Sequence, residues 1–342
     1  MNLFFDYDLP ARLIAQEPAE PRDAARLLVG QGDAKDYDHR HVRDLPEILK
    51  PGDLLVMNDT KVVPARLIGQ REATGGKWEA LFLKDAPSGQ WEVLAQTRGY
   101  ALEGEHFVTE SGLRLVLTGR TAERHWLMRP DPPGATTVLL ANHGQVPLPP
   151  YIRKGRATTG DAERYQTVYA RWLGSVAAPT AGLHFTRELL ERLEARGIGT
   201  ARVTLHVGLG TFAPVKEADP TKHAIHAEWC EVTAETARAI RATRAAGGRV
   251  IAVGTTTART LETAGRTGLL THSGETSLFI HPPYEFRVVD GLFTNFHLPR
   301  TTLLLLVQAL TGSAVLKRMY EEAIGCEYGF YSYGDAMLWL PG

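Results

Sequence analysis

The pattern of apolar residues changes between residues 62 and 145, and this change restricts the fold more than any other feature of the chain. Short runs alternate apolar and polar residues at positions 78–83, 91–95, 113–117 and 125–128. Pieces rich in glycine, proline and serine separate these runs, and no long helical period is visible. Short alternating runs between turns are typical of antiparallel strands in a small barrel or sandwich. We therefore expect an inserted all-β domain here.

The second half of the chain alternates between predicted strands and predicted helices. The strands are expected at residues 200–207 and 249–253. The helices are expected at residues 187–196, 234–246, 302–310 and 314–324, and threonines suited to cap three of them are Thr186, Thr233 and Thr301. Such alternation predicts an α/β layer. The expected organisation is an α/β core, residues 1–61 and 146–342, with a small β-barrel domain at residues 62–145 inserted into it.

Composition and charge narrow the class of protein. A chain of 342 residues, 44% of them hydrophobic, is long enough for roughly two domains with sizeable cores. The formal net charge is −1, so any contact with nucleic acid must use a local basic patch. Cys230 and Cys326 match no metal-binding or disulfide spacing, which favours a reducing cytoplasm. No apolar run is long enough to cross a bilayer, so we expect no membrane attachment.

Two short blocks set a histidine among glycines and threonines. They are residues 178–186, with Thr180, Gly182 and His184, and residues 205–212, with His206, Gly208, Gly210 and Thr211. Glycine lets the backbone approach a ligand, and histidine is the side chain whose proton moves most easily near neutral pH. We interpret the blocks as walls of a site. The alternative is that each histidine is buried and bonded to a backbone carbonyl.

Three consecutive threonines follow one predicted strand and open a helix. They are Thr255, Thr256 and Thr257. Amides and hydroxyls at the amino end of a helix can bind a carboxylate or a phosphate. Helix capping by one of the three threonines explains part of this pattern.

Two histidines and a glutamate lie close together in the sequence, as metal ligands often do. It consists of His223, His226 and Glu228. At helical spacing the histidines would share a face, as metal ligands often do. The local sequence shows no clear helix, however, and no third strong ligand segment accompanies the cluster. We therefore expect no metal, and favour contact with substrate or a polar network.

Isolated acidic and basic residues complete the candidate set. The acids and the remaining histidine are Asp59, Glu275, Asp335 and His297. For Asp59 and Asp335 the alternative is a turn aspartate that bonds its own backbone. Candidate contacts to RNA are Arg153, Lys154 and Arg156, with Tyr151 as a surface for an unstacked base and Arg12 in a second basic set near the start. The alternative for these residues is a solvated loop.

Motifs along almost the whole chain resemble one known family. Besides the two histidine blocks, they are residues 5–10, 13–18, 52–67, 147–152, 164–170, 254–262, 294–299 and 332–337. Their number and order resemble the S-adenosylmethionine:tRNA ribosyltransferase-isomerases of queuosine biosynthesis. The plan of that family, an α/β core with an inserted β-barrel, agrees with the patterns above.

The resemblance implies a specific reaction. The ribosyl part of S-adenosylmethionine is transferred to 7-aminomethyl-7-deazaguanine at the wobble position of a tRNA and rearranged, which gives epoxyqueuosine-tRNA and releases adenine and methionine. The reaction needs a base near the carbon beside the sulfonium and an acid for the departing adenine. It needs no cofactor, because S-adenosylmethionine is a consumed substrate.

The resemblance also divides the candidates by role. Proton transfer is expected of His184 and His206 first, and then of Asp59, Glu275 and His297. The glycines and threonines named above, the His223 cluster and Asp335 are expected to bind substrate, and the protein is expected to be a monomer. The family usually carries an acid where Ser277 stands, which makes Glu275 the stronger acidic candidate.

Two classes of protein remain as alternatives. A non-catalytic RNA-binding protein would explain the barrel but not the histidine and threonine blocks, and a metal-dependent hydrolase would rest on the His223 cluster. A nicotinamide dehydrogenase is disfavoured, since no glycine-rich dinucleotide motif follows an early strand. Residues 97–104 are less basic than expected of a close relative, which weakens any large tRNA contact by that face of the insert.

Overall fold

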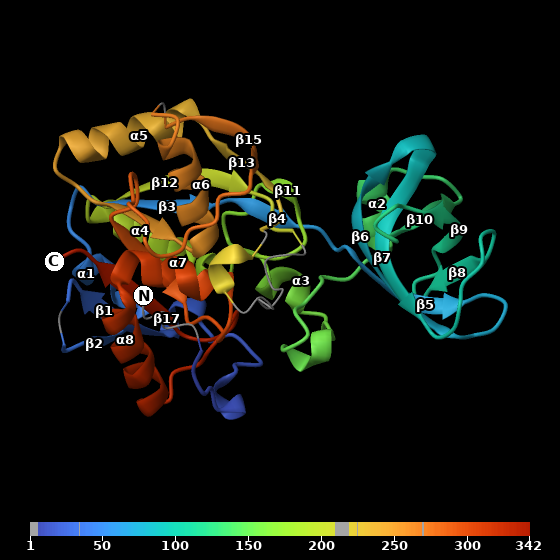
Figure 1. Cartoon of the computed structure of the whole chain (residues 1–342), viewed down its shortest axis with the longest axis horizontal. Coiled ribbons are helices and arrows are strands. Elements are labelled where there is room, and N and C mark those ends of the chain that lie inside the picture. The colour runs from blue at the N-terminus through green and yellow to red at the C-terminus, as the bar shows by residue number, and fades with distance from the viewer. Residues whose placement is uncertain (1–5, 34, 209–218, 224, 269) are drawn as a thin grey trace. The chain divides into compact units, whose positions relative to one another are not determined.

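The computed structural model describes residues 6–33, 35–208, 219–223, 225–268 and 270–342 (Figure 1). The chain forms two compact units. Unit 1 contains Met1–Lys61, Tyr151–Lys154 and Arg164–Gly342, and unit 2 contains Val62–Pro150 and Gly155–Glu163.

A mixed sheet forms the centre of unit 1. Its strands are β1 (Arg26–Gln31), β2 (Asp38–His41), β3 (Leu54–Asn58), β12 (Gly199–Leu205), β13 (Glu228–Val232), β14 (Val250–Val253), β15 (His272–Thr276), β16 (Gly291–Asn295) and β17 (Ala336–Leu340). Within the described chain their order is β15-β13-β12-β3-β14-β16-β17-β1-β2. The neighbours β12, β3, β14 and β16 run parallel, so their carboxyl ends meet at one edge.

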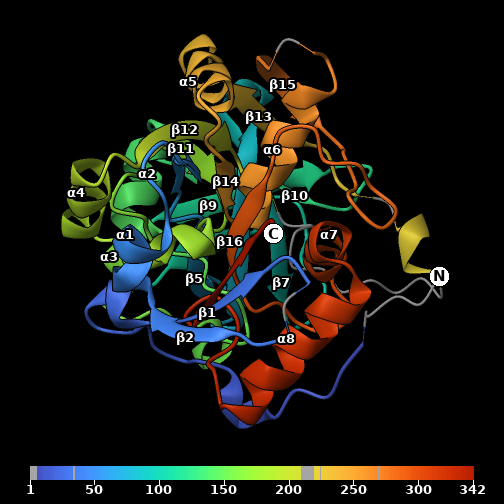
Figure 2. The same ribbon diagram turned by 90° about the vertical axis from the view of Figure 1, so that its left-hand side faces the viewer.

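Helices cover both faces of this sheet, as Figure 2 shows. One face carries α5 (Ala234–Ala245), α6 (Thr255–Gly265), α7 (Thr302–Thr311) and α8 (Ser313–Gly325), and the other carries α1 (Leu45–Ile48), the 3-10 helix η6 (Thr180–His184) and α4 (Arg187–Ala195). Strand β3 shows why two layers are needed. Leu54 and Val56 are buried against the first set of helices, and Leu55 and Met57 against the second. The expected α/β core is therefore confirmed.

The expected threonine caps are confirmed at three helices. Thr186, Thr233 and Thr301 each accept a hydrogen bond from the backbone N–H three residues later, at the start of α4, α5 and α7. Each such cap stabilises its helix by about 1 kcal/mol. Within the described residues no single helix has the length and apolarity to cross a membrane, although α7 and α8 would qualify as a pair bent by 116°.

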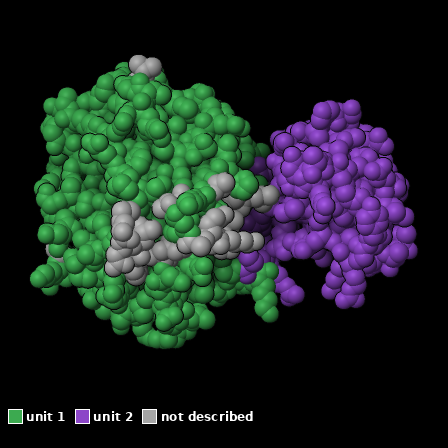
Figure 3. All heavy atoms as spheres, in the orientation of Figure 1, with its two compact units in different colours: residues 1–61, 151–154, 164–342 green, residues 62–150, 155–163 purple. Residues whose placement is uncertain are grey.

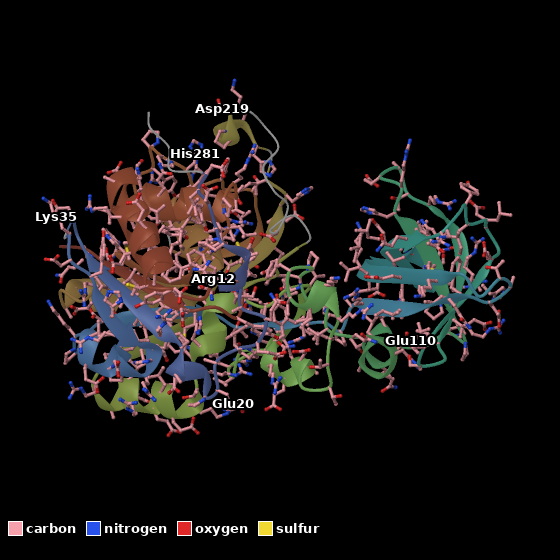
Figure 4. All side chains as sticks on the ribbon, turned by 90° about the horizontal axis from the view of Figure 1, so that it is seen from below. Arg12, Glu20, Lys35, Glu110, Asp219 and His281 are labelled. Atoms are coloured by element: carbon pink, nitrogen blue, oxygen red, sulfur yellow. The ribbon has the colours of Figure 1, made fainter. Side chains whose placement is uncertain are left out.

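Unit 2 is the inserted β domain, a closed antiparallel barrel. Its strands are β5 (Arg66–Arg71), β6 (Lys77–Ala86), β7 (Gln90–Thr97), β8 (His106–Thr109), β9 (Arg114–Arg120) and β10 (Trp126–Asp131), and they close in the order β10-β7-β6-β5-β8-β9. Trp78, Trp91 and Phe107 are buried. Glu110, labelled in Figure 4, follows β8 on this unit. The sequence did not predict β5, β8 or the helix α2 (Thr136–His143).

The return from the insert differs from the expected boundary (Figure 3). The sequence places residues 146–150 and 155–163 in the core, but they pack with unit 2. Arg66 explains part of the difference, because its guanidinium donates to the carbonyl of Gly155. A single arginine on β5 thus ties residue 155 to the barrel, which no pattern of apolar residues reveals.

Candidate active site at the carboxyl edge of the sheet

The carboxyl ends of the parallel strands bring distant parts of the sequence together. Ligands of open α/β sheets bind at this edge. Asn58, the last residue of β3, fixes the end of β12: its Nδ2 donates to the carbonyl of Leu205 at 3.0 Å, and its Oδ1 accepts from the N–H of Leu205 at 3.0 Å. Its amide also lies 3.4 Å from Oγ1 of Thr256 at the start of α6. The edge is therefore a fixed frame.

His206 follows β12 directly and is the one partly exposed side chain of the three candidate catalytic histidines. Its Nδ1 lies 2.8 Å from Oγ1 of Thr60. The imidazole stacks on Trp229, with the ring centroids 5.2 Å apart and the planes at 21°. Burial lowers the pKa of His206, so the ring is neutral at pH 7. A neutral imidazole with one nitrogen held and one edge accessible is suited to general-base catalysis.

Gly174 makes room for the His206 ring. It belongs to β11 (Trp172–Ser175), which pairs with β4 (Thr60–Val62). A Cβ at position 174 would lie 2.8 Å from both Cε1 and Nε2 of His206, closer than real Cβ contacts. Sequence reasoning missed this residue and Thr60. The available signal was a glycine beside apolar residues, which often marks a close approach in a strand.

His184 is buried at the end of η6 and is held by Asn295. Its Nε2 lies 3.1 Å from Nδ2 of Asn295, whose amide also donates to the carbonyl of Tyr331 and whose Oδ1 accepts from Oγ1 of Thr180. The amide therefore donates to Nε2, and the imidazole proton lies on Nδ1. Burial, with the nearby charge of Arg22, lowers the pKa of His184 to about 4. This histidine is neutral, and its basic nitrogen is occupied.

His297 is buried just beyond β16, where its contacts favour a structural role. Its Nε2 lies 3.0 Å from Oγ1 of Thr294, its N–H donates to the hydroxyl of Tyr320, and its carbonyl accepts from the hydroxyl of Tyr7. Burial lowers the pKa of His297 to about 3. The geometry therefore favours packing over proton transfer.

The two carboxylates proposed as catalytic differ in exposure. Asp59 is buried directly after β3, and its Oδ1 accepts from Oγ1 of Thr204 at 2.7 Å. Burial raises the pKa of Asp59, although Arg202 opposes this shift. Glu275 is exposed on β15, directly opposite Trp229 in the antiparallel register. Residues opposite each other share a face of the sheet, so Glu275 lies on the face where Trp229 stacks with His206.

A pocket lies at the amino end of α6. Its lining includes Thr255, Thr256 and Arg259, with apolar residues from 278–280 and α7, and it is partly open to solvent. Capping by a threonine is wrong for this helix, because the N-cap is Gly254 and no side chain caps it. The hydroxyl of Thr257 instead donates to the carbonyl four residues earlier. The first-turn amides therefore have no side-chain cap, as an anion site requires.

Glu228 connects the second histidine block to this pocket. It is buried, its carboxylate accepts from the N–H of Gly208 at 2.6 Å, and it forms an ion pair with Arg259. The sequence motif at residues 254–262 contains Arg259, but the sequence alone did not identify Arg259 as a site residue. Gly182, in the first block, is also tightly placed, since a Cβ there would lie 2.1 Å from the hydroxyl oxygen of Tyr169. Gly210 and Thr211 lie outside the described residues.

The histidines of the possible metal cluster do not share a helix face. His223 is half-buried and His226 is exposed, and neither belongs to a helix. In the part of the chain that the structure describes, the one group whose three ligand atoms lie within 4.8 Å of one another is His39, Glu322 and Cys326. Those residues belong to β2 and to α8 and its end, rather than to the strands that frame the site.

The carboxylate of Asp335 binds backbone N–H groups that lie outside its own turn. Its carboxylate accepts from the N–H of Arg26 and from the N–H of Gly329, each at 2.7 Å, and it pairs with the guanidinium of Arg26 at 3.3 Å. These contacts fix the start of β1 beside the start of β17. They favour a structural role for Asp335 over contact with substrate.

Several predicted RNA contacts are engaged within the protein. Arg153 forms an ion pair with Glu17, and Arg12, labelled in Figure 4, pairs with Glu327 at 2.9 Å. Lys154 is exposed, and so is Arg156. An arginine already paired with a carboxylate has less to gain from a phosphate, so Lys154 is the stronger candidate of the return segment.

Tyr151 offers less surface to a base than the sequence suggested. Its ring lies 4.3 Å from that of Tyr331, and its hydroxyl is 2.7 Å from Oγ of Ser332. Burial raises the pKa of Tyr151 well above its usual value. These contacts favour a packing role for the tyrosine.

Comparison with known proteins identifies the family of the chain. A family profile described as queuosine biosynthesis protein matches residues 3–339. The chain is 52% identical to a protein of Symbiobacterium thermophilum over 98% of each chain, and 50% identical to one of Cereibacter sphaeroides over 99% of this chain and 98% of the other. Both are named S-adenosylmethionine:tRNA ribosyltransferase-isomerase. A crystal structure of the S-adenosylmethionine tRNA ribosyltransferase of Thermotoga maritima shares 38% identity, with a TM-score of 0.56 over 98% of this chain and 99% of that one.

Proposed function

This chain belongs to the family of queuosine biosynthesis proteins, and we propose that its reaction takes place at the carboxyl edge of β3, β12, β14 and β16. It is an S-adenosylmethionine:tRNA ribosyltransferase-isomerase, whose substrates are S-adenosylmethionine and a tRNA. The ribosyl group passes to 7-aminomethyl-7-deazaguanine at the wobble position and is rearranged to the epoxide of epoxyqueuosine. Adenine and methionine leave.

His206 is the base that takes the proton from the carbon beside the sulfonium. The contact between Thr60 and His206 carries this assignment. When Nδ1–H donates to Oγ1 of Thr60, the lone pair of the half-buried ring lies on Nε2. The lowered pKa keeps that lone pair unprotonated at pH 7. A positioned base of this kind contributes about 10²–10⁴-fold to the rate.

The remaining polar groups have complementary roles. Asp59, buried directly after β3 with a pKa that burial raises, is assigned as the acid for the departing adenine. His184 acts as a neutral donor through Nδ1–H rather than as a base, because Asn295 occupies its Nε2. Glu275 places a negative charge on the face that carries Trp229 and His206, where it stabilises the sulfonium cation.

The pocket at α6 holds the methionine end of the donor. The amides of Thr255 and Thr256 suit its carboxylate, and Arg259, although paired with Glu228, keeps an Nε–H that has no partner among the described residues. The reaction requires no metal or redox cofactor, because the sulfonium already activates the carbon beside it. We propose that the protein acts as a monomer in the cytoplasm, without membrane attachment.

The reaction itself tests this function. The purified chain is incubated with S-adenosylmethionine and a tRNA that carries the 7-aminomethyl-7-deazaguanine precursor, and the tRNA nucleosides are then analysed by mass. Epoxyqueuosine and one equivalent of free adenine are expected, and omission of either substrate should abolish both. Binding of tRNA without release of adenine would instead support a non-catalytic RNA-binding protein.

A further inference from the structure

The exposed large apolar side chains of unit 1 belong to two segments that contact His206. Among the described residues of that unit they are Trp172, Leu173 and Trp229, which are 50%, 44% and 37% exposed. Trp229 stacks on the His206 ring, and Trp172 and Leu173 directly precede Gly174, which touches the same ring. An exposed apolar patch beside a candidate active site is typical of a binding surface.

Two cations flank this patch. The guanidinium of Arg171 lies 4.7 Å from the centre of the Trp172 ring, and Lys61 is the exposed residue of β4, the partner strand of β11. Neither forms an ion pair with a described residue, although the charge of Arg171 also acts on the buried carboxylate of Asp59. The backbone N–H groups of Arg171 and Trp172 donate to the carbonyl of Asp59 at 2.7 and 3.3 Å, which fixes the segment. The surface thus offers fixed aromatic rings beside positive charge.

We propose that Trp172, with Leu173 and Trp229, is the surface on which an unstacked anticodon base of the tRNA lies, while Arg171 and Lys61 contact the adjacent phosphates. This inference rests on the proposed function. Bases stack on aromatic side chains, and cations follow the backbone of a single strand. Single-stranded RNA offers base rings to the aromatic groups and phosphates to the two cations. A base held here lies beside His206, where its amine must meet the ribosyl group.

Substitution of Trp172 provides the direct test. Binding of the whole chain to an anticodon stem-loop is followed by fluorescence anisotropy at several salt concentrations. Trp172→Ala should weaken binding about 5- to 150-fold, because one stacked base contributes that much. The dependence of log Kd on log salt should keep its slope, and Trp172→Phe should recover most of the affinity. Arg171→Ala should instead lower the slope by about one unit.

A matched control is available in the barrel. Tyr100 is also an exposed aromatic residue beneath an arginine, with the guanidinium of Arg120 5.0 Å from its ring centre. Tyr100→Ala should leave stem-loop affinity within about twofold of wild type, as expected for a surface change. If Trp172→Ala does not fold, Leu173→Ser reports on the same patch.

Three outcomes would overturn the inference. One is unchanged stem-loop affinity in both Trp172→Ala and Leu173→Ser. Another is a loss of S-adenosylmethionine affinity with RNA binding unchanged, which would assign the patch to the adenine of the donor. The third is a changed oligomeric state in light scattering with RNA affinity retained, which would assign it to a second copy of the chain. Failure of the wild-type chain to bind the stem-loop would instead count against the proposed function.

Discussion

Nδ1 of His206 lies 2.8 Å from Oγ1 of Thr60, although 146 residues separate the two in sequence. The contact joins the end of β12 to the start of β4. It holds one ring nitrogen, and in the proposed mechanism the other takes the proton of the substrate. The assignment of His206 as the base therefore depends on Thr60, whose own side chain takes no part in the reaction.

Removal of the Thr60 hydroxyl should slow the chemical step. Thr60→Val keeps the shape of the side chain but cannot bond Nδ1. A net hydrogen bond is worth about 1 kcal/mol, so the single-turnover rate should fall about 5- to 10-fold. Thr60→Ser retains the hydroxyl and should stay close to wild type. Equal rates for the valine and serine variants would contradict the role of this contact.

Gly174→Ala should displace the His206 ring. The added Cβ would meet Nε2 at 2.8 Å, and such overpacking costs about 1–3 kcal/mol. The single-turnover rate should fall while S-adenosylmethionine still binds. Gly325→Ala is the matched control, because a Cβ there meets nothing within 4 Å. A wild-type rate for Gly174→Ala would show that the His206 ring can shift without loss of activity, which would contradict the tight placement.

Two buried histidines should make stability depend on pH. In the folded protein the pKa of His184 is about 4 and that of His297 is about 3, against about 6.5 in the unfolded chain. The unfolded chain therefore binds more protons over this interval. The free energy of unfolding should be constant above about pH 6.5 and fall at lower pH, by up to about 1.4 kcal/mol per pH unit and histidine.

Urea unfolding between about pH 7.5 and 4.5 measures this dependence. His297→Gln should be less stable at neutral pH but should lose stability less steeply on acidification. A variant whose slope matches that of wild type would show that His297 does not resist protonation in the folded state.

Glu228→Gln should destabilise unit 1 and weaken donor binding. The substitution leaves the half-buried Arg259 without its ionic partner, and breaking such a buried pair costs about 3–5 kcal/mol. Glu275→Gln, at an exposed position, should change stability by no more than about 0.5 kcal/mol. Urea unfolding and calorimetric titration with S-adenosylmethionine measure both effects. Equal stability of the two variants would contradict the structural role of the ion pair.

Local patterns were enough to predict much of the fold. Alternating apolar residues predicted the barrel, and Thr186, Thr233 and Thr301 predicted three helix starts that the structure confirms. Strands β5 and β8 were missed because their apolar residues are few. The end of the insert was misplaced in part because the contact of Arg66 with the carbonyl of Gly155 joins positions 89 residues apart in sequence.

The candidate site was predictable in its residue types but not in its geometry. The histidine blocks singled out His184 and His206 equally. Only the fold distinguishes them. Asn295 occupies Nε2 of His184, whereas Thr60 holds Nδ1 of His206. Gly174 and Arg259 were missed because their importance lies in contacts with His206 and Glu228, which sequence spacing does not reveal.

The single-turnover rate of His206→Ala tests most directly whether His206 is the base. The variant is saturated with S-adenosylmethionine and precursor tRNA, and release of adenine is followed in one cycle. We expect a rate lower by about 10²–10⁴-fold with both substrates still bound, while His297→Gln, if folded, keeps a rate near wild type. A near-wild-type rate for a correctly folded His206→Ala would contradict the assignment of His206 as the base.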